Sequence, residues 1–285
     1  MIGFNYLGKM GQLGNQMFQY ASLRGIASKH GYDWCIPPED CANDSNYGLF
    51  ETFEMTNVKT NNIGYVNGPT IQESNHNLDL SLFDECPDNV NVHGYLQTEK
   101  YFSHISDEIR EDFTFKKEYL EPCQDIINSL ETSPIFLHIR RTDAVGREEY
   151  HPILKLDYFK AALSNWQDET PVFVFTDDLE WCKSQTFFED DRFLFNESNG
   201  RYSYKTIDGT GRMQNTLLPQ VDLCLMSLCS GAIIANSSFS WWGAWLQNGR
   251  GPVIAPDPKN WFGSKLSHLD TSDIVPETWT IQKLQ

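Results

Sequence analysis

Two adjacent arginines follow an apolar run in the middle of the chain. The run covers residues 134–139, includes His138 near its end, and leads directly into Arg140, Arg141 and Asp143. A guanidinium is always charged and carries a rigid fork of donors that suits phosphate oxygens. These residue types at this spacing therefore indicate a binding site for an anionic ligand. A cluster of surface ion pairs at a strand end is the alternative that these residues leave open.

A second candidate site lies at residues 236–246, where three serines stand beside three tryptophans. Ser237, Ser238 and Phe239 come just after an apolar run and open a predicted helix. The helix dipole and the unpaired N–H groups of a first turn both favour an anion at such a place. An ordinary serine N-cap, with the tryptophans packed in the core, is the alternative reading.

Three carboxylates stand near predicted helix starts. Asp222 precedes Ser237 by fifteen residues, and a carboxylate can accept two hydrogen bonds from the N1–H and 2-amino groups of guanine. Asp177 and Asp178 follow the apolar run 172–176, where capping of the next helix is the more ordinary role. No Asp-x-Asp pair occurs that would bridge a cation to a diphosphate, so no metal site is predicted.

Alternating strands and helices must position these residues. Short apolar runs recur at residues 134–139, 172–176, 193–195, 232–235 and 253–255, mostly with helical patterns between them. This alternation predicts right-handed crossovers and a parallel sheet. Ligands of open α/β sheets bind beyond the carboxyl ends of the strands, which is where the charged residues stand.

The N-terminus repeats this arrangement. A strand is predicted at residues 2–7, a glycine-rich turn at 8–16 and a helix at about 17–30, with Gln12 and Asn15 inside the turn. Glycines let a backbone approach a ligand closely, and a helix start offers free N–H groups. The spacing matches neither G-x-G-x-x-G nor a phosphate loop, and a plain tight turn is the alternative.

Composition narrows the class of protein. Lys and Arg number 22 against 39 Asp and Glu, so the net charge of -17 argues against a nucleic-acid partner. The seven cysteines form no Cys-x-x-Cys pair, which favours a reducing compartment and disfavours zinc. No apolar run is long enough for a transmembrane segment, and no signal peptide opens the chain. We therefore expect a cytoplasmic protein.

The step from Ser133 to Pro134 ends the helical pattern before it, because the residue before a proline disfavours helix. We place the domain boundary there, giving domains at residues 1–132 and 133–285. Residues 37–91 carry little readable pattern.

Four stretches together resemble the α-1,2-fucosyltransferases of glycosyltransferase family 11. These are residues 11–20, 94–102, 138–143 and 237–246. The resemblance implies an α/β fold of the GT-B type, with two Rossmann-like domains facing across a cleft. The first domain would form the acceptor side and the second would bind GDP-fucose. The implied reaction is an inverting, metal-independent transfer of L-fucose to the 2-hydroxyl of a terminal galactose, without a cofactor.

The resemblance also implies roles for individual residues. The implied catalytic group is Asn15, His138, Arg140 and Asp143. The implied donor-binding group is Gln12, Asn15, Arg140, Arg141, Asp222, Ser237, Ser238 and Phe239. Arg140 would contact the β-phosphate and Asp222 the guanine, whereas Gln12 stands where many relatives carry Arg or Gly.

The general base that takes the proton of the sugar hydroxyl stays open between Asp143, Glu148 and Glu99. The implied partners are GDP-fucose and a galactose-terminated oligosaccharide or lipid-linked glycan. The latter would bring peripheral association with the inner face of a membrane. Choice of acceptor is expected to depend on residues 37–91.

Two other functions compete with this one. The first is a fucosyltransferase with a different acceptor, such as a protein hydroxyl. The second is a non-catalytic carbohydrate-binding protein that uses Trp241, Trp242 and Trp245 as stacking platforms.

Overall fold

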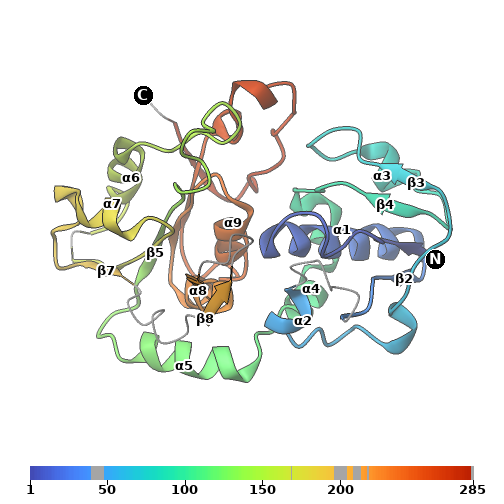
Figure 1. Ribbon diagram of the computed structural model, residues 1–285, viewed down its shortest axis with the longest axis horizontal. Helices are drawn as coiled ribbons and strands as arrows, with labels where there is room; N and C mark the ends of the chain where they lie inside the picture. Colours follow the sequence, from blue (N-terminus) through green and yellow to red (C-terminus); the bar gives the residue numbers. More distant parts are fainter. Residues whose placement is uncertain (40–47, 168, 196–203, 208–212, 217, 284–285) are drawn as a thin grey trace. The chain divides into compact units, whose positions relative to one another are not determined.

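The computed structural model describes residues 1–39, 48–167, 169–195, 204–207, 213–216 and 218–283. The chain divides into two compact units (Figure 1). The N-terminal unit joins Met1–Lys116 with Pro258–Thr278, and the C-terminal unit joins Lys117–Asp257 with Trp279–Gln285.

A parallel four-stranded sheet, in the order β2-β1-β4-β3, forms the centre of the N-terminal unit. Its strands are β1 (Ile2–Gly3), β2 (Trp34–Cys35), β3 (Thr70–Gln72) and β4 (Asn91–His93). Its helices are α1 (Leu13–His30), α2 (Leu49–Thr52), α3 (Leu80–Asp84) and α4 (Ser106–Asp112). Its 3₁₀ helices are η2 (Thr60–Asn62), η3 (Glu99–Tyr101), η4 (Ser103–Ile105), η7 (Pro258–Asn260) and η8 (Ser264–Leu266).

Helix α1 confirms the predicted N-terminal helix, although it begins four residues earlier than expected, at Leu13. It ends at His30 and is capped by Gly31, whose φ of 66° lies in the left-handed region that glycine adopts without strain. The preceding strand is shorter than the predicted 2–7, because the chain turns away from the sheet after Gly3.

A buried ion pair joins α1 to α4 within the N-terminal unit. Asp112 is fully buried, and its carboxylate accepts hydrogen bonds from Arg24 and from the hydroxyl of Tyr20. The guanidinium of Arg24 lies 4.9 Å from the ring centre of Trp34 and 3.0 Å from the exposed carboxylate of Glu108. The pair is therefore enclosed by both aromatic and charged neighbours.

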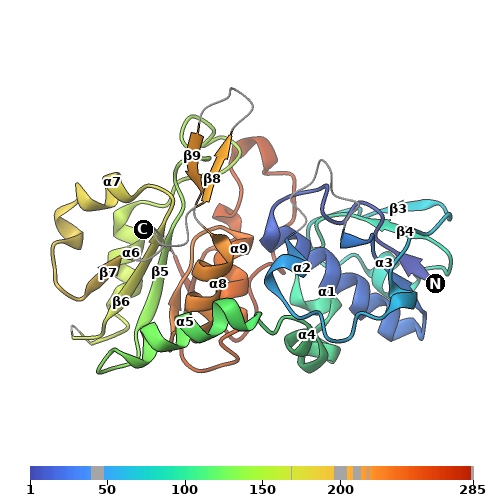
Figure 2. The ribbon, with the colours of Figure 1, turned by 60° about the horizontal axis from the view of Figure 1, so that its bottom comes forward.

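The C-terminal unit is built on a six-stranded parallel sheet in the order β12-β11-β10-β5-β6-β7. Its strands are β5 (Ile135–Ile139), β6 (Val172–Thr176), β7 (Phe193–Phe195), β10 (Ala232–Ile233), β11 (Val253–Pro256) and β12 (Thr280–Gln282). Its helices are α5 (Lys117–Asn128), α6 (Leu156–Leu163), α7 (Leu179–Lys183), η5 (Thr186–Phe188), α8 (Pro219–Leu228) and α9 (Ser238–Trp245). The C-terminal unit also contains an antiparallel hairpin of β8 (Tyr204–Ile207) and β9 (Met213–Thr216) (Figure 2). All five predicted apolar runs are strands of this sheet, which confirms the predicted alternation.

The side chains of strand β5 are divided between the two faces of the sheet, because successive residues of a strand point to opposite faces. Ile135, Leu137 and Ile139 belong to the core cluster that includes α6. Phe136 and His138 point to the other face, which α8 and α9 cover (Figures 1 and 2).

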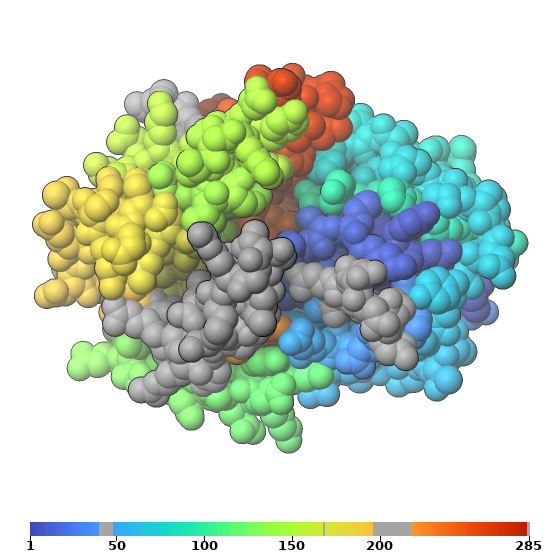
Figure 3. Space-filling model, in the orientation of Figure 1, coloured from blue at the N-terminus to red at the C-terminus, as the bar shows by residue number. Residues whose placement is uncertain are grey.

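The division into units differs from the boundary placed at residues 132 and 133. Helix α5 packs against α8 and belongs to the C-terminal unit, and its residues are visible at the surface in Figure 3. Pro258–Thr278 returns to the N-terminal unit, where the side chain of Asp273 forms an ion pair with Lys100 at 2.6 Å.

Candidate active site

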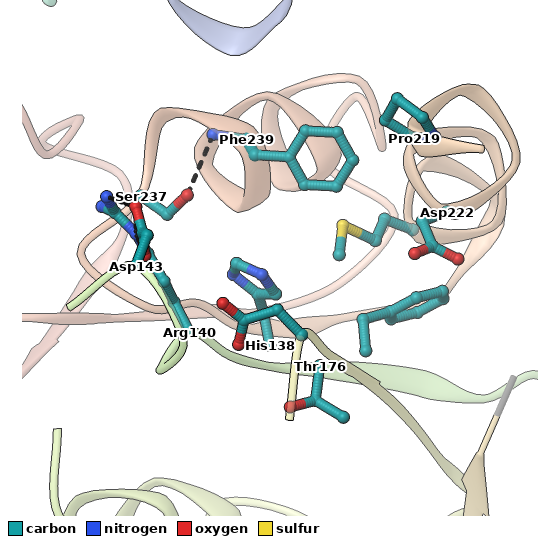
Figure 4. Close-up of a pocket in the computed structure, with 11 residues that line it drawn as sticks. His138, Arg140, Asp143, Thr176, Pro219, Asp222, Ser237 and Phe239 are labelled. Carbon is teal, nitrogen blue, oxygen red and sulfur yellow. Dashed lines mark hydrogen bonds and ion pairs between the residues drawn. The ribbon is translucent and has the colours of Figure 1, made fainter. Parts of the chain in front are cut away.

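A cavity of about 260 Å³ lies at the carboxyl ends of β5 and β6 (Figure 4), and we call it the β5 cavity. Its lining residues all belong to the C-terminal unit: His138, Arg140, Asp143, Phe175, Thr176, Asp177, Pro219, Asp222, Met226, Ser237 and Phe239. The first turns of α8 and α9 complete the cavity. This is the place where open parallel sheets bind ligands.

Arg140 is held in a fixed orientation at one end of the β5 cavity. Its Nε donates to Oδ1 of Asp143 at 2.9 Å, and its Nη2 donates to Oδ2 at 2.5 Å. Its Nη1 donates to the backbone carbonyl of Asn236 at 3.2 Å. A guanidinium has five N–H donors, so these contacts orient the group and leave donor capacity for an anion.

Asp143 is engaged by this contact. The hydrogen bonds from Arg140 hold the pKa of the Asp143 carboxyl below its usual range. A carboxylate with a lowered pKa is a weak proton acceptor near neutral pH. The geometry therefore favours a role for Asp143 in positioning Arg140. It argues against Asp143 as the general base.

His138 is buried beneath the β5 cavity, with 9% of its surface exposed. Burial lowers the pKa of His138 to about 4, so the imidazole is neutral at physiological pH. Within the part of the chain that the structure describes, its Nδ1 has no hydrogen-bond partner. His138 can therefore offer a ligand a hydrogen bond without adding charge.

Ser237 is the N-cap of α9, because its Oγ accepts from the backbone N–H of Phe239 at 3.3 Å (Figure 4). The capping alternative is thus confirmed for this hydroxyl. Ser237 and Phe239 also line the β5 cavity, whereas Ser238, the first residue of α9, does not. The start of α9 therefore faces the cavity through two of the three predicted residues.

Asp222 lies in the first turn of α8, which begins at Pro219. In Figure 4, Asp222 and Pro219 lie at one end of the β5 cavity, and Arg140 and Ser237 lie at the other. One end of the cavity thus carries the Asp222 carboxylate, and the opposite end carries the Arg140–Asp143 ion pair beside the start of α9. That polarity matches a ligand with a nucleobase and a diphosphate.

Arg141 is not among the residues that line the β5 cavity. Its Nε donates to Asp178 at 3.1 Å, and its guanidinium stacks 3.9 Å from the ring centre of Trp181. Asp178 also caps α7, as the sequence predicted. Asp177 instead accepts from the backbone N–H groups of Arg141 and Thr142, and it fixes the loop after β5.

The tryptophans of α9 are buried. Trp241 and Trp242 expose 0% of their surface and Trp245 exposes 6%. A sugar cannot stack on rings that are already covered, so the carbohydrate-binding alternative loses its proposed platforms. The three rings pack against one another and support the helix that carries Ser237.

Asn15 and Gln12 belong to the N-terminal unit, at the start of α1. The Oδ1 of Asn15 accepts from Gln97 at 2.7 Å, which links the glycine-rich turn to the stretch 94–102. Gly11 has a φ of 81°, and a Cβ at this position would come within 2.3 Å of the Asn15 amide. The turn therefore needs glycine both for its backbone and for the packing of Asn15.

Glu73 and His76 were not singled out from the sequence. His76 contacts Gln97 at 3.2 Å, and the carboxylate of Glu73 accepts from the backbone N–H groups of Tyr95 and Leu96. Both residues come from the 37–91 region, in which no periodic pattern points to them.

Among the described residues, no group of three or more His, Cys, Asp or Glu side chains is arranged to hold a metal ion. Over the same residues, no helix is both long and apolar enough to cross a membrane.

The architecture identifies the class of protein. The chain matches the fucosyltransferase NodZ from Bradyrhizobium with a TM-score of 0.54 at 15% identity, over 90% of this chain and 94% of that one. Each of its two α/β units is built on a parallel sheet. The protein has a fold of the GT-B type, which is found in glycosyltransferases. The model of Glycosyl transferase family 11 matches residues 2–282, and the chain belongs to that family.

Relatives in sequence agree with this assignment. The alpha-1,2-colitosyltransferase of Escherichia coli is 30% identical over 94% of this chain and 95% of its own length. Galactoside alpha-(1,2)-fucosyltransferase 1 of Homo sapiens is 25% identical over 84% of this chain and 64% of its own length. The protein is thus a glycosyltransferase, as the resemblance implied.

Proposed function

We propose that the protein transfers L-fucose from GDP-fucose to the 2-hydroxyl of a terminal galactose. The observation that carries the proposal is the polarity of the β5 cavity, with Asp222 at one end and Arg140 beside the start of α9 at the other. The family and the α-1,2 linkage in the names of both relatives support the acceptor position.

The proposed reaction inverts the anomeric carbon by in-line attack and needs no metal ion. The bond between that carbon and the β-phosphate breaks as the acceptor oxygen attacks, so negative charge grows on the departing diphosphate. Arg140, which contacts the carbonyl of Asn236, and the N–H groups at the start of α9 would stabilise this charge. His138, as a neutral imidazole, would add a hydrogen bond.

Colitose is a second candidate for the transferred sugar, because one relative is a colitosyltransferase. Colitose is fucose without its 3-hydroxyl. A GDP-linked colitose would share with GDP-fucose the GDP portion for which the β5 cavity is proposed. Parallel assays with GDP-fucose and GDP-colitose would decide between them.

The test is release of GDP from GDP-fucose, with and without lactose, each with and without EDTA. We expect lactose-dependent release that EDTA does not reduce, and a product in which linkage analysis finds an α-1,2 bond. GDP binding without release in any mixture would refute lactose-type galactosides as acceptors. A peptide-dependent release would favour the protein-acceptor alternative.

Asp222 supplies a sharper prediction about the nucleotide. If its carboxylate accepts from guanine, wild-type protein should bind GDP more tightly than inosine diphosphate, which lacks the 2-amino group. Asp222→Asn should weaken GDP binding roughly 10- to 150-fold, the range for a lost charge-assisted hydrogen bond. Calorimetric titration with both nucleotides measures this.

The preference for GDP over inosine diphosphate should also shrink in Asp222→Asn. A thermal melt of the variant controls for damage to α8. An unchanged preference in a folded variant would remove Asp222 from the proposed guanine site.

A further inference from the structure

The chain turns sharply after β5, and this turn brings Asp143 to Arg140. The backbone N–H groups of Ala144 and Val145 both donate to the carbonyl of Arg141 at 2.9 Å. The carboxylate of Asp143 thereby returns to the guanidinium three residues before it, and the two groups lie at the same end of the β5 cavity (Figure 4). The ion pair that orients Arg140 therefore depends on the shape of this turn.

The turn is capped by Asp177, which comes from the end of the neighbouring strand β6. The first N–H groups of such a turn cannot bond within it and need an outside acceptor, as at the start of a helix. The Oδ1 of Asp177 accepts from the N–H of Arg141 at 2.8 Å. Its Oδ2 accepts from the N–H of Thr142 at 2.9 Å and from the hydroxyl of Thr142 at 2.6 Å. Hydrogen bonds to a charged acceptor are about twice as strong as neutral ones, so this cap is a firm one.

Asp177 also extends the pairing of β5 with β6 beyond the last paired residues. These are Ile139 on β5 and Thr176 on β6, and Asp177 directly follows Thr176. Arg140 therefore stands between Ile139, which the sheet holds, and Arg141, which Asp177 holds. The backbone of Arg140 is restrained on both sides.

The carboxylate of Asp177 is poorly suited to contact the donor itself. Asp177 lines the β5 cavity, but three donors already occupy three of its roughly four lone-pair sites. Its negative charge would also repel a diphosphate. The geometry points to a role in holding Arg140 in place.

We propose that Asp177 is a positioning residue for Arg140 in the transfer reaction, an inference that rests on the proposed function. Asp177 holds the turn that keeps Asp143 against Arg140, and Arg140 stabilises the charge on the departing diphosphate. A misplacement of about 1 Å at a reacting centre can cost about 10²-fold in rate. Asp177 thus affects the rate without touching the donor.

A second route connects Asp177 to the β5 cavity, and the test must separate it from the first. Burial lowers the pKa of His138 to about 4, and the negative charge of Asp177 opposes this shift. A loss that passed through His138 would be independent of Arg140. Combining the substitution at Asp177 with one at Arg140 distinguishes the two routes.

The test measures kcat for GDP release from GDP-fucose at saturating lactose, with variants of the full chain. Asp177→Ala should lower kcat roughly 10- to 100-fold because Arg140 is no longer held in position. The KM for GDP-fucose and the calorimetric Kd of GDP should stay within about threefold, because Asp222 and the start of α9 are unchanged. Asp177→Asn keeps one acceptor oxygen and should retain an intermediate kcat.

The decisive measurement is the double variant that combines Asp177→Ala with Arg140→Ala. If Asp177 acts through Arg140, this variant should be slower than Arg140→Ala by no more than about twofold, because residues that act as a unit give non-additive losses. Asp190→Ala is the matched control. Asp190 is an exposed carboxylate that also accepts from a backbone N–H, that of Arg192 at 3.0 Å, but it is not among the residues lining the β5 cavity. This control should keep kcat within about twofold of wild type.

Losses that multiply in the double variant, or Asp177→Ala with a wild-type kcat, overturn the proposal. A merely structural role would reduce the amount of folded enzyme, and that loss would multiply with the loss in Arg140→Ala. If Asp177→Ala does not fold, Asp177→Asn, alone and combined with Arg140→Ala, completes the cycle. A wild type that releases no GDP refutes the proposed function, and the role of Asp177 falls with it.

Discussion

Replacing Arg140 with alanine is expected to lower kcat for fucose transfer roughly 10²- to 10³-fold, or about 2.7–4 kcal/mol of transition-state stabilisation. Asp143 and the carbonyl of Asn236 orient the guanidinium before any donor arrives. A donor group already in position costs no reorganisation when charge develops on the leaving diphosphate. Initial rates of GDP release at saturating lactose measure the effect.

Two further variants sharpen this prediction. Arg140→Lys keeps the charge but loses the fork of donors, so it should recover only part of the rate. Arg192→Ala removes a guanidinium that stacks on Phe193, away from the residues lining the β5 cavity, and should change kcat by less than about twofold. Near-normal turnover in Arg140→Ala would overturn the proposed phosphate contact.

Asp112→Ala is expected to lower the free energy of unfolding of the N-terminal unit by about 3–5 kcal/mol. The substitution leaves the guanidinium of Arg24 buried without its main counter-charge and removes the acceptor of the Tyr20 hydroxyl. An uncompensated buried charge is costly because the low-dielectric interior solvates it poorly. Urea unfolding followed by tryptophan fluorescence measures the loss.

Glu108→Ala is the matched control. Glu108 contacts the same guanidinium at 3.0 Å, but 57% of its side chain is exposed. Water already screens such a pair, so its loss should cost only about 0–1 kcal/mol. Equal losses in the two variants would show that burial does not determine how much each of these two ion pairs contributes to stability.

The sequence predicted the C-terminal unit well because its strands are continuous apolar runs. In the buried run that forms β5, the change to charged residues at its end located His138, Arg140 and Asp143 on the cavity. The different direction of Arg141 was not predictable from spacing. It depends on Asp178 and Trp181, which stand almost forty residues later in the chain.

The N-terminal unit was harder to read, because its strands are only two or three residues long and carry no periodic signal. No sequence pattern singles out Glu73, because it is one acidic residue in a polar stretch. Its setting arises only when β3 pairs with β4 and brings it against Gly94. The return of Pro258–Thr278 to this unit is likewise a tertiary contact that local pattern cannot reveal.

That return segment has a consequence for folding during synthesis. Asp273 pairs with Lys100 and also accepts from the backbone N–H of Leu78, so the last part of the N-terminal unit is made after the whole of β5 to β11. A ribosome adds roughly 5–20 residues per second, and domains usually fold as they emerge. The N-terminal unit therefore stays incomplete until the strands of the C-terminal unit up to β11 have been made.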